Sequence, residues 1–127
     1  RACLLMRLRH DVDVERLVDL DVLAQRLSPV VKEWQRLAWV GPFTWRDQMA
    51  RWPQPITSDR ESVQLPDSLG IRVRRGADSE FEIVVWAGGW ADVEFLRDGE
   101  VYSFCPEFSD VGGAFSSVVK EIEDFLA

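Results

Sequence analysis

The sequence predicts an α+β fold: an antiparallel β-meander of three to five strands, covered by a C-terminal amphipathic helix and preceded by a helical portion. Three observations favour it. The run from Glu80 to Phe104 alternates apolar and polar residues, as half-buried strands do. Glycine-containing turns interrupt this run at two places. The tail from Val111 onward has apolar residues at three- and four-residue spacing, which indicates a helix.

The first part of the chain, about residues 14–52, is predicted to be helical. Residues 14–27 carry an apolar pattern compatible with one helix, and Ser28-Pro29 offers a cap and a first-turn proline for a second helix that runs to about Val40. Thr44, with Asp47 three residues later, resembles a capping box that opens a short helix ending at residue 52. This part is therefore expected to contain three helices.

The remaining chain is predicted to complete a single domain, residues 1–127. Residues 53–60 form the only stretch that resembles a linker, and it is too short to separate two independent domains. The sheet and the C-terminal helix then occupy about residues 61–127. A strand is expected at about residues 70–75, with Arg72 and Arg74 directed outward, and another near Val63 and Leu65.

The alternation also predicts the register of the first hairpin. A two-residue turn at Gly88-Gly89 would place Trp86 opposite Ala91 and mix core and solvent residues on both faces. A three-residue loop, residues 87–89, instead pairs Val85 with Ala91, and a glycine supplies the positive φ angle that such loops need. The odd-length loop is therefore predicted.

The second hairpin and the final helix have clear local signals. Asp98-Gly99 suits a two-residue type I′ turn, which pairs Phe95 with Tyr102 on the inner face. Asp110 or Ser109 can cap the final helix. The pair of glycines at residues 112–113 weakens the first turn, so the helix is expected to begin a few residues late.

This register gives the outer face of the sheet an acidic, tryptophan-bearing surface. Glu82 lies opposite Glu94 with Asp92 nearby, and Trp86 lies opposite Trp90. An exposed aromatic pair beside carboxylates is typical of the centre of a protein interface, which makes these five residues the predicted partner-binding site. The alternative is that the N-terminal helices, which must bury their own apolar stripes, cover both indoles.

Composition favours a protein partner. Fifteen basic and twenty-two acidic residues give a net charge of −7, which repels nucleic acid and anionic membranes and favours a basic protein surface. No apolar run approaches the roughly 20 residues that a membrane-spanning helix needs. Residues 4–6 are too few for a signal peptide, so a cytoplasmic location is expected.

The residues that usually carry catalysis are scarce. Cys3 and Cys105 have no redox or metal-site spacing and are expected to be free thiols, with Cys105 near acidic Asp92. The sole histidine, His10, lies near one end. No cofactor, metal site or catalytic residue is predicted. The best enzyme hypothesis is the Glu82–Glu94 pair, whose proximity could raise one pKa and create an acid and a base.

One segment resembles a known group of proteins. Residues 85–94 (VWAGGWADVE), followed by Asp98-Gly99 and the C-terminal helix, are similar to small α+β immunity proteins of bacterial polymorphic toxin systems, in particular the TriTu-like group. The likeness covers about the C-terminal half. It implies a cytoplasmic, non-catalytic protein that binds and neutralises one cognate toxin. Two alternatives stay open, namely a small-ligand or carboxylate-dependent enzyme domain and a self-associating structural module.

Overall fold

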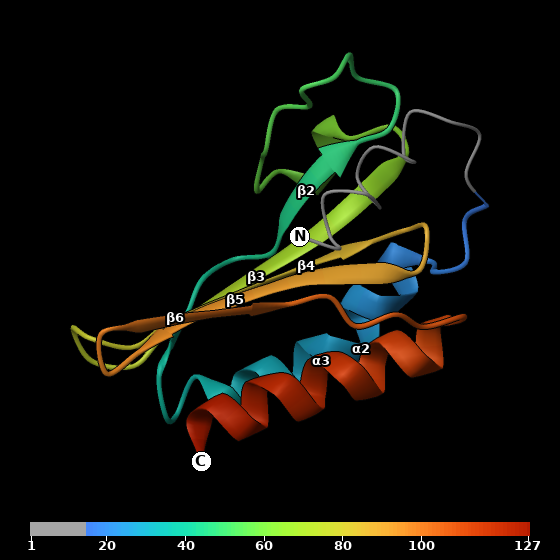
Figure 1. Cartoon of the computed structure of the whole chain (residues 1–127). Helices are drawn as coiled ribbons and strands as arrows, with labels where there is room; N and C mark the ends of the chain where they lie inside the picture. The colour runs from blue at the N-terminus through green and yellow to red at the C-terminus, as the bar shows by residue number, and fades with distance from the viewer. Residues whose placement is uncertain (1–14) are drawn as a thin grey trace.

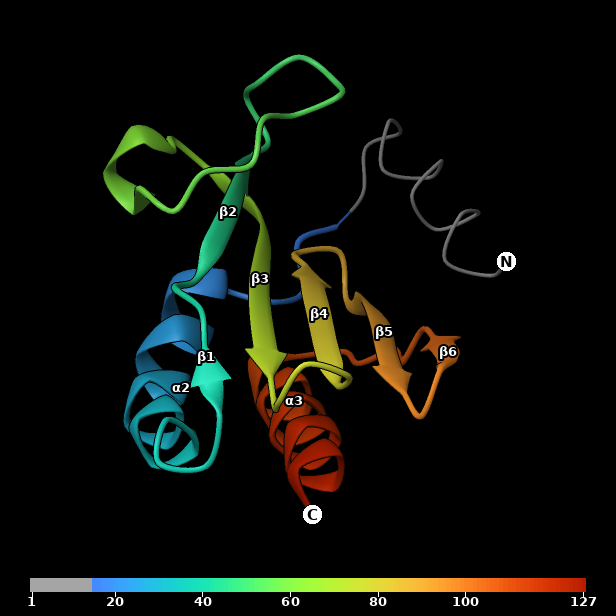
Figure 2. The same cartoon turned by 90° about the vertical axis from the view of Figure 1, so that its left-hand side faces the viewer.

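A six-stranded antiparallel sheet with helices on one face forms the structure, a computed structural model that describes residues 15–127 (Figures 1 and 2). The predicted α+β class is confirmed, with six strands instead of three to five. The order is β1-β3-β4-β5-β6, and β2 also pairs with β3. The elements are α2 (Leu20–Trp34), β1 (Trp39–Val40), β2 (Thr44–Asp47), the 3-10 helix η1 (Arg60–Ser62), β3 (Pro66–Arg74), β4 (Glu80–Trp86), β5 (Trp90–Arg97), β6 (Glu100–Phe104) and α3 (Val111–Leu126).

Both predicted hairpin registers are confirmed. Val85 pairs with Ala91 across the three-residue loop, so Trp86 pairs with Trp90, and Gly89 has a φ of 105°. A Cβ atom at Gly89 would also lie 2.7 Å from the Phe108 carbonyl oxygen. Both the positive φ angle and this close contact therefore favour glycine at the position. The next turn has positive φ at both central residues, 53° and 80°, as a type I′ turn requires.

The expected strand at residues 70–75 is present but longer, because β3 begins at Pro66. Arg72 and Arg74 point away from the helices, as predicted, and the residues near 63 and 65 are not part of a strand. β1 and β2 pair with opposite ends of β3. Residues 39–47 thus belong to the sheet, and the predicted helical portion over residues 14–52 is wrong in its second half.

The prediction of a short helix from Thr44 is wrong, and the contacts of Asp47 explain why. The Asp47 carboxylate accepts backbone N–H groups of Met49, Gln64 and Leu65 at 2.9–3.1 Å, so it joins two segments of the chain instead of closing a helical turn. Residues 44–46 alternate beside β3, with Trp45 buried. Tertiary pairing outweighs the capping-box signal here.

The break predicted at Ser28-Pro29 does not occur. One helix, α2, continues through Pro29 and ends at Trp34, and it begins at Leu20 instead of residue 14. Asp19 caps it by accepting the N–H groups of residues 21 and 22, each at 3.1 Å. The buried stripe Leu20, Leu23, Leu27 and Trp34 spans the proline, so burial outweighs the hydrogen bond that proline cannot make.

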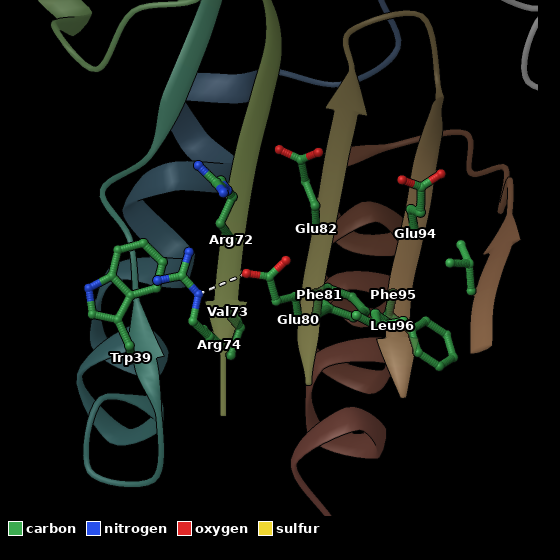
Figure 3. Close-up of a pocket in the computed structure, with 11 residues that line it drawn as sticks. Trp39, Arg72, Val73, Arg74, Glu80, Phe81, Glu82, Glu94, Phe95 and Leu96 are labelled. Carbon is green, nitrogen blue, oxygen red and sulfur yellow. Dashed lines mark hydrogen bonds and ion pairs between the residues drawn. The ribbon is translucent and has the colours of Figure 1, made fainter. Parts of the chain in front are cut away.

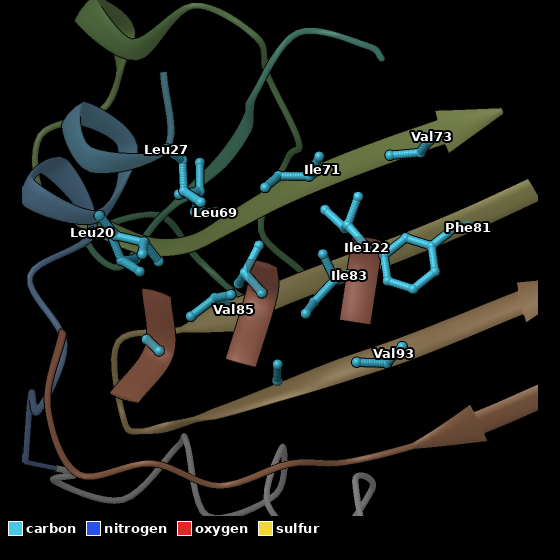
Figure 4. Packing of buried hydrophobic residues seen from close by; sticks show 14 of the residues in the cluster. Leu20, Leu27, Leu69, Ile71, Val73, Phe81, Ile83, Val85, Val93 and Ile122 are labelled. Atoms are coloured by element: carbon cyan, nitrogen blue, oxygen red, sulfur yellow. The ribbon is translucent and has the colours of Figure 1, made fainter. Parts of the chain in front are cut away.

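Helix α3 completes the core. Asp110 accepts the Gly113 N–H at 2.7 Å and caps the helix at Val111, so the late start expected from its glycines is wrong. Both helices lie on the inner face of the sheet, with α2 against β3 and α3 against β4 (Figure 1). Figure 4 shows Ile122 of α3 beside the inward side chains of Ile83 and Val93. All three are fully buried.

The cysteine prediction needs a correction. Cys105 is disulfide-bonded, so the expected free thiol is wrong at this position. Cys3 and His10 lie outside the described residues. The sulfur of Cys105 lies 3.8 Å from Asp92 Oδ1, which confirms the expected proximity of these two side chains. None of the helices in residues 15–127 has the length and apolar character needed to cross a membrane.

Candidate partner-binding surface

The outer face of the sheet has two ends with different environments. We call Trp86, Trp90 and Asp92 the tryptophan end, and Glu80, Glu82 and Glu94 the glutamate end. Cross-strand pairing sets both: Trp86 pairs with Trp90 near the three-residue loop, and Glu82 pairs with Glu94 farther along the same strands. The structure therefore places all five predicted site residues on one face, as their alternation requires.

The tryptophan end is buried. Trp86 and Trp90 are only 2% and 5% exposed, and their rings stack at a centroid separation of 6.1 Å and an interplanar angle of 18°. Trp52 lies 6.2 Å from Trp86, and the Arg46 guanidinium lies 5.1 Å above the Trp86 ring. Both indoles thus contribute to a second, smaller core with Val84.

Among residues 15–127, the predicted helical cover over this end is not observed. Helix α2 lies on the opposite face of the sheet (Figure 2). The contacts just described come instead from Arg46 in β2 and from Trp52 in the segment between β2 and β3. That segment was predicted to be helix and linker, so sequence reasoning had no reason to place it over the sheet.

Asp92 is a buried acid, 5% exposed, which accepts the Trp86 indole N–H at 3.2 Å. A second buried acid, Asp67, is 1% exposed and accepts the side-chain amide of Gln54 at 2.8 Å. Buried carboxylates need such donors, since desolvation otherwise disfavours them. Sequence reasoning missed Asp67 and Gln54, because neither belongs to a strand or helix pattern that predicts burial.

The glutamate end is accessible. Glu80, Glu82 and Glu94 are exposed and surround an open depression of about 290 Å³ (Figure 3). Glu80 accepts from Arg74 at 2.9 Å, and Arg74 also lies 4.9 Å from the ring of Trp39, which is 48% exposed. This ion pair is solvent-exposed and contributes only up to about 1 kcal/mol of stability.

Glu82 and Glu94 form the central pair of this end. They are direct partners across the ladder, and Arg72 is the partner of Glu82 on the other side. Among the described residues, however, no ion pair within 4.0 Å joins Arg72 to Glu82. Like charges directly opposite each other are unfavourable in a sheet.

Apolar side chains lie beside the carboxylates. Leu96 pairs with Glu80 on one side and with Val101 on the other, and Val101 is 66% exposed. Together with Trp39, they line the depression beside the carboxylates, and Arg72 and Arg74 line it as well. Exposed apolar groups bordered by charge are typical of protein interfaces.

Other kinds of site find less support in the structure. Within residues 15–127, no group of three or more His, Cys, Asp or Glu side chains is arranged to hold a metal ion. The depression is open, whereas small-molecule sites are usually enclosed and bury most of the ligand. Carboxylates, guanidinium groups and apolar side chains all line it.

Comparisons with models of known protein families, with curated proteins and with solved structures found no match to this chain.

Proposed function

We propose that the protein is a non-catalytic binding protein, an immunity protein that neutralises a cognate bacterial toxin with a basic surface. Glu82 and Glu94 at the glutamate end would make the direct contacts. Trp86, Trp90 and Asp92 would support these contacts from within the sheet, since all three are buried. The proposal includes a cytoplasmic location, no cofactor, and no nucleic-acid or membrane partner.

One observation carries the proposal: two glutamates are direct cross-strand partners on the sheet face that neither helix covers. Both carboxylates are exposed on this face, so both can contact a cationic surface. The net charge of −7 acts in the same direction over longer distances. It attracts a basic partner and accelerates encounter at low ionic strength.

The resemblance of residues 85–94 to immunity proteins gives the proposal its biological class. A toxin that acts on nucleic acid is basic around its active site, because that site must attract phosphates. An acidic inhibitor therefore matches such a toxin in charge. The candidate partner is the product of the open reading frame beside the gene for this protein.

A co-expression and binding experiment tests the proposal. The protein should protect cells from the neighbouring gene product and co-purify with it. Reversing two charges, Glu82→Lys with Glu94→Lys, should lower the association rate about tenfold or more at low salt. The control, Glu33→Lys with Glu123→Lys, makes the same charge change on α2 and α3, at exposed positions on the helical side. Equal effects of the two pairs would contradict the assignment of the surface, and lack of protection would contradict the function.

A further inference from the structure

An exposed tryptophan ends a row of side chains that crosses the outer face of the sheet. Cross-strand pairs connect the members of this row, which are Trp39, Arg74, Glu80, Leu96 and Val101. Each member comes from a different strand, so four strand spacings, about 19 Å, separate the backbones at the two ends. Both ends carry large apolar side chains that are open to solvent, since Trp39 is 48% and Val101 is 66% exposed.

The Trp39 ring has defined neighbours although nearly half of its surface is exposed. The Arg74 guanidinium lies 4.9 Å from the ring centroid, and Arg74 donates to the Glu80 carboxylate at 2.9 Å (Figure 3). Gly41 also lies close to the ring, because a Cβ atom at this position would be 2.8 Å from Trp39 Cη2. A side chain at Gly41 would therefore force the ring to move.

This arrangement suits a residue that anchors a binding partner. Tryptophan and arginine are enriched among the few residues that dominate the binding energy of protein interfaces. A ring that is already held in one orientation loses less conformational freedom when a partner binds. Its large exposed surface also leaves apolar area for a partner to bury.

We propose that Trp39 is a further contact residue for the protein partner, and that Gly41 and Arg74 hold its ring in the binding orientation. This inference rests on the proposed function and extends the contact surface from the glutamate end to β1. Trp39 is then an anchor in direct contact with the partner, whereas Gly41 and Arg74 are positioning residues that act through the ring.

The row also specifies what the partner should present. Arg74 and Glu80 form an ion pair in the middle of the row, so uncharged polar groups suffice opposite them. Trp39 at one end, and Leu96 with Val101 at the other, call for apolar side chains. The partner surface should therefore have two apolar contacts about 19 Å apart with polar groups between them.

Size and charge favour a protein as the occupant. A compact ligand that fills the depression of about 290 Å³ is much shorter than the row and cannot bury both of its ends. A second copy of this chain would bring together two net charges of −7, whereas the basic partner of the proposed function matches that charge.

Two variants of the full chain test the anchor by different means. Trp39→Ala removes the indole, whereas Gly41→Ala keeps the indole but displaces it; the φ of Gly41 is not positive, so its backbone accepts alanine. We expect Trp39→Ala to weaken binding of the neighbouring gene product at least about tenfold, and Gly41→Ala about threefold or more. Leu37→Ala is the control, because it removes a 58%-exposed side chain that lines a separate depression beside α2 and α3, and it should leave binding unchanged.

A double-mutant cycle separates positioning from a general structural role. If Gly41 acts through the ring, Gly41→Ala should have no further effect in the Trp39→Ala background. An equal loss in both backgrounds would overturn the role of Gly41. If the natural protein binds and Trp39→Ala binds equally well, the anchor is wrong while the proposed function stands. If the natural protein does not bind the neighbouring gene product, both are wrong.

Nuclear magnetic resonance relaxation of the Trp39 indole N–H tests the orientation without the partner. We expect an order parameter close to that of rigid backbone, about 0.85, and a value below about 0.6 would overturn the proposal. Arg74→Gln should lower the order parameter, because it removes the guanidinium beside the ring; an unchanged value would overturn the role of Arg74. A concentration-dependent dimer that Trp39→Ala abolishes would overturn the choice of occupant, since the ring would then serve self-association.

Discussion

The two ends of the outer sheet face differ in what their side chains contact, although the same two strands form both. At the tryptophan end, Trp86 and Trp90 are buried and form a second core, and Trp52 and Arg46 contact the Trp86 ring. At the glutamate end, Glu82 and Glu94 face solvent around an open depression. The comparison indicates that alternation predicts which face a residue occupies, whereas the rest of the chain determines whether that face is accessible.

The largest effect is expected at Trp86. Replacing this buried indole with alanine should lower the free energy of unfolding by about 3–5 kcal/mol, as is usual when a buried aromatic side chain is lost. Urea denaturation measures the loss. Trp39→Ala, which removes a 48%-exposed indole, is the control and should cost about 1 kcal/mol or less. Similar losses for both variants would remove the distinction between the two ends.

A smaller loss is expected at Asp92. Asp92→Ala leaves the buried Trp86 indole N–H without the acceptor it has at 3.2 Å, which should cost about 1–3 kcal/mol. Trp86→Phe removes the donor, so Asp92→Ala should cost less in that background than in the natural one. A double-mutant cycle measured by urea denaturation gives this coupling. Zero coupling would show that Asp92 stabilises the region through other contacts.

Protonation of Asp47 should make the stability of the region around the tryptophan end depend on pH. Hydrogen bonds from backbone N–H groups, Gln64 first and then Met49 and Leu65, hold the pKa of this carboxyl below its ordinary value of 3.8. A lowered folded-state pKa gives stability that is present above the unfolded-state pKa and is lost as pH falls through the folded-state pKa. Below about pH 4, the segment that carries Trp52 should therefore loosen.

Tryptophan fluorescence during an acid titration measures this change. Asp47→Asn keeps one acceptor oxygen but cannot ionise, so it should reduce the acid-dependent part of the loss in stability, which we expect to be about 1 kcal/mol because the group is still partly exposed to solvent. Asp59→Asn in the neighbouring loop is the control, since its carboxylate caps only η1. An unchanged acid response in Asp47→Asn would assign the transition to other carboxyl groups.

Much of the C-terminal half could be predicted because its determinants are local. Three local features determine the registers of β4, β5 and β6: the alternation of apolar and polar residues, the odd number of residues in the loop that contains Gly89, and the Asp98-Gly99 turn. The α3 cap at Asp110 is equally local. The start of α3 was not predicted correctly, because packing of its apolar stripe outweighs the low helix propensity of its glycines. The disulfide at Cys105 was not predicted either.

The N-terminal half was harder to predict because its structure depends on distant partners. β1 is only two residues long and exists because β3 pairs with it. Thr44 and Asp47 carry a helix-start signal, yet two of the three backbone N–H groups that Asp47 accepts belong to residues 17 and 18 positions later. For the site, sequence predicted the face and the pairing of all five residues, but not the contact that Trp52, from the β2–β3 segment, makes with Trp86.

The smallest effect on stability is expected at Glu82, and its sign is informative. Glu82→Gln removes one of two like charges that face each other across the ladder, so it should raise the free energy of unfolding by about 0.2–0.5 kcal/mol at low salt. The gain should fade at high salt, because exposed charges are screened. Urea denaturation at two ionic strengths measures both the gain and its loss at high salt.

The same variant should weaken partner binding, so that a residue slightly unfavourable for folding is favourable for recognition. If Glu82→Gln instead lowers stability by 1 kcal/mol or more, Glu82 serves the fold through a favourable interaction such as attraction to Arg72, and the glutamate end loses the surplus charge on which recognition of a cation depends.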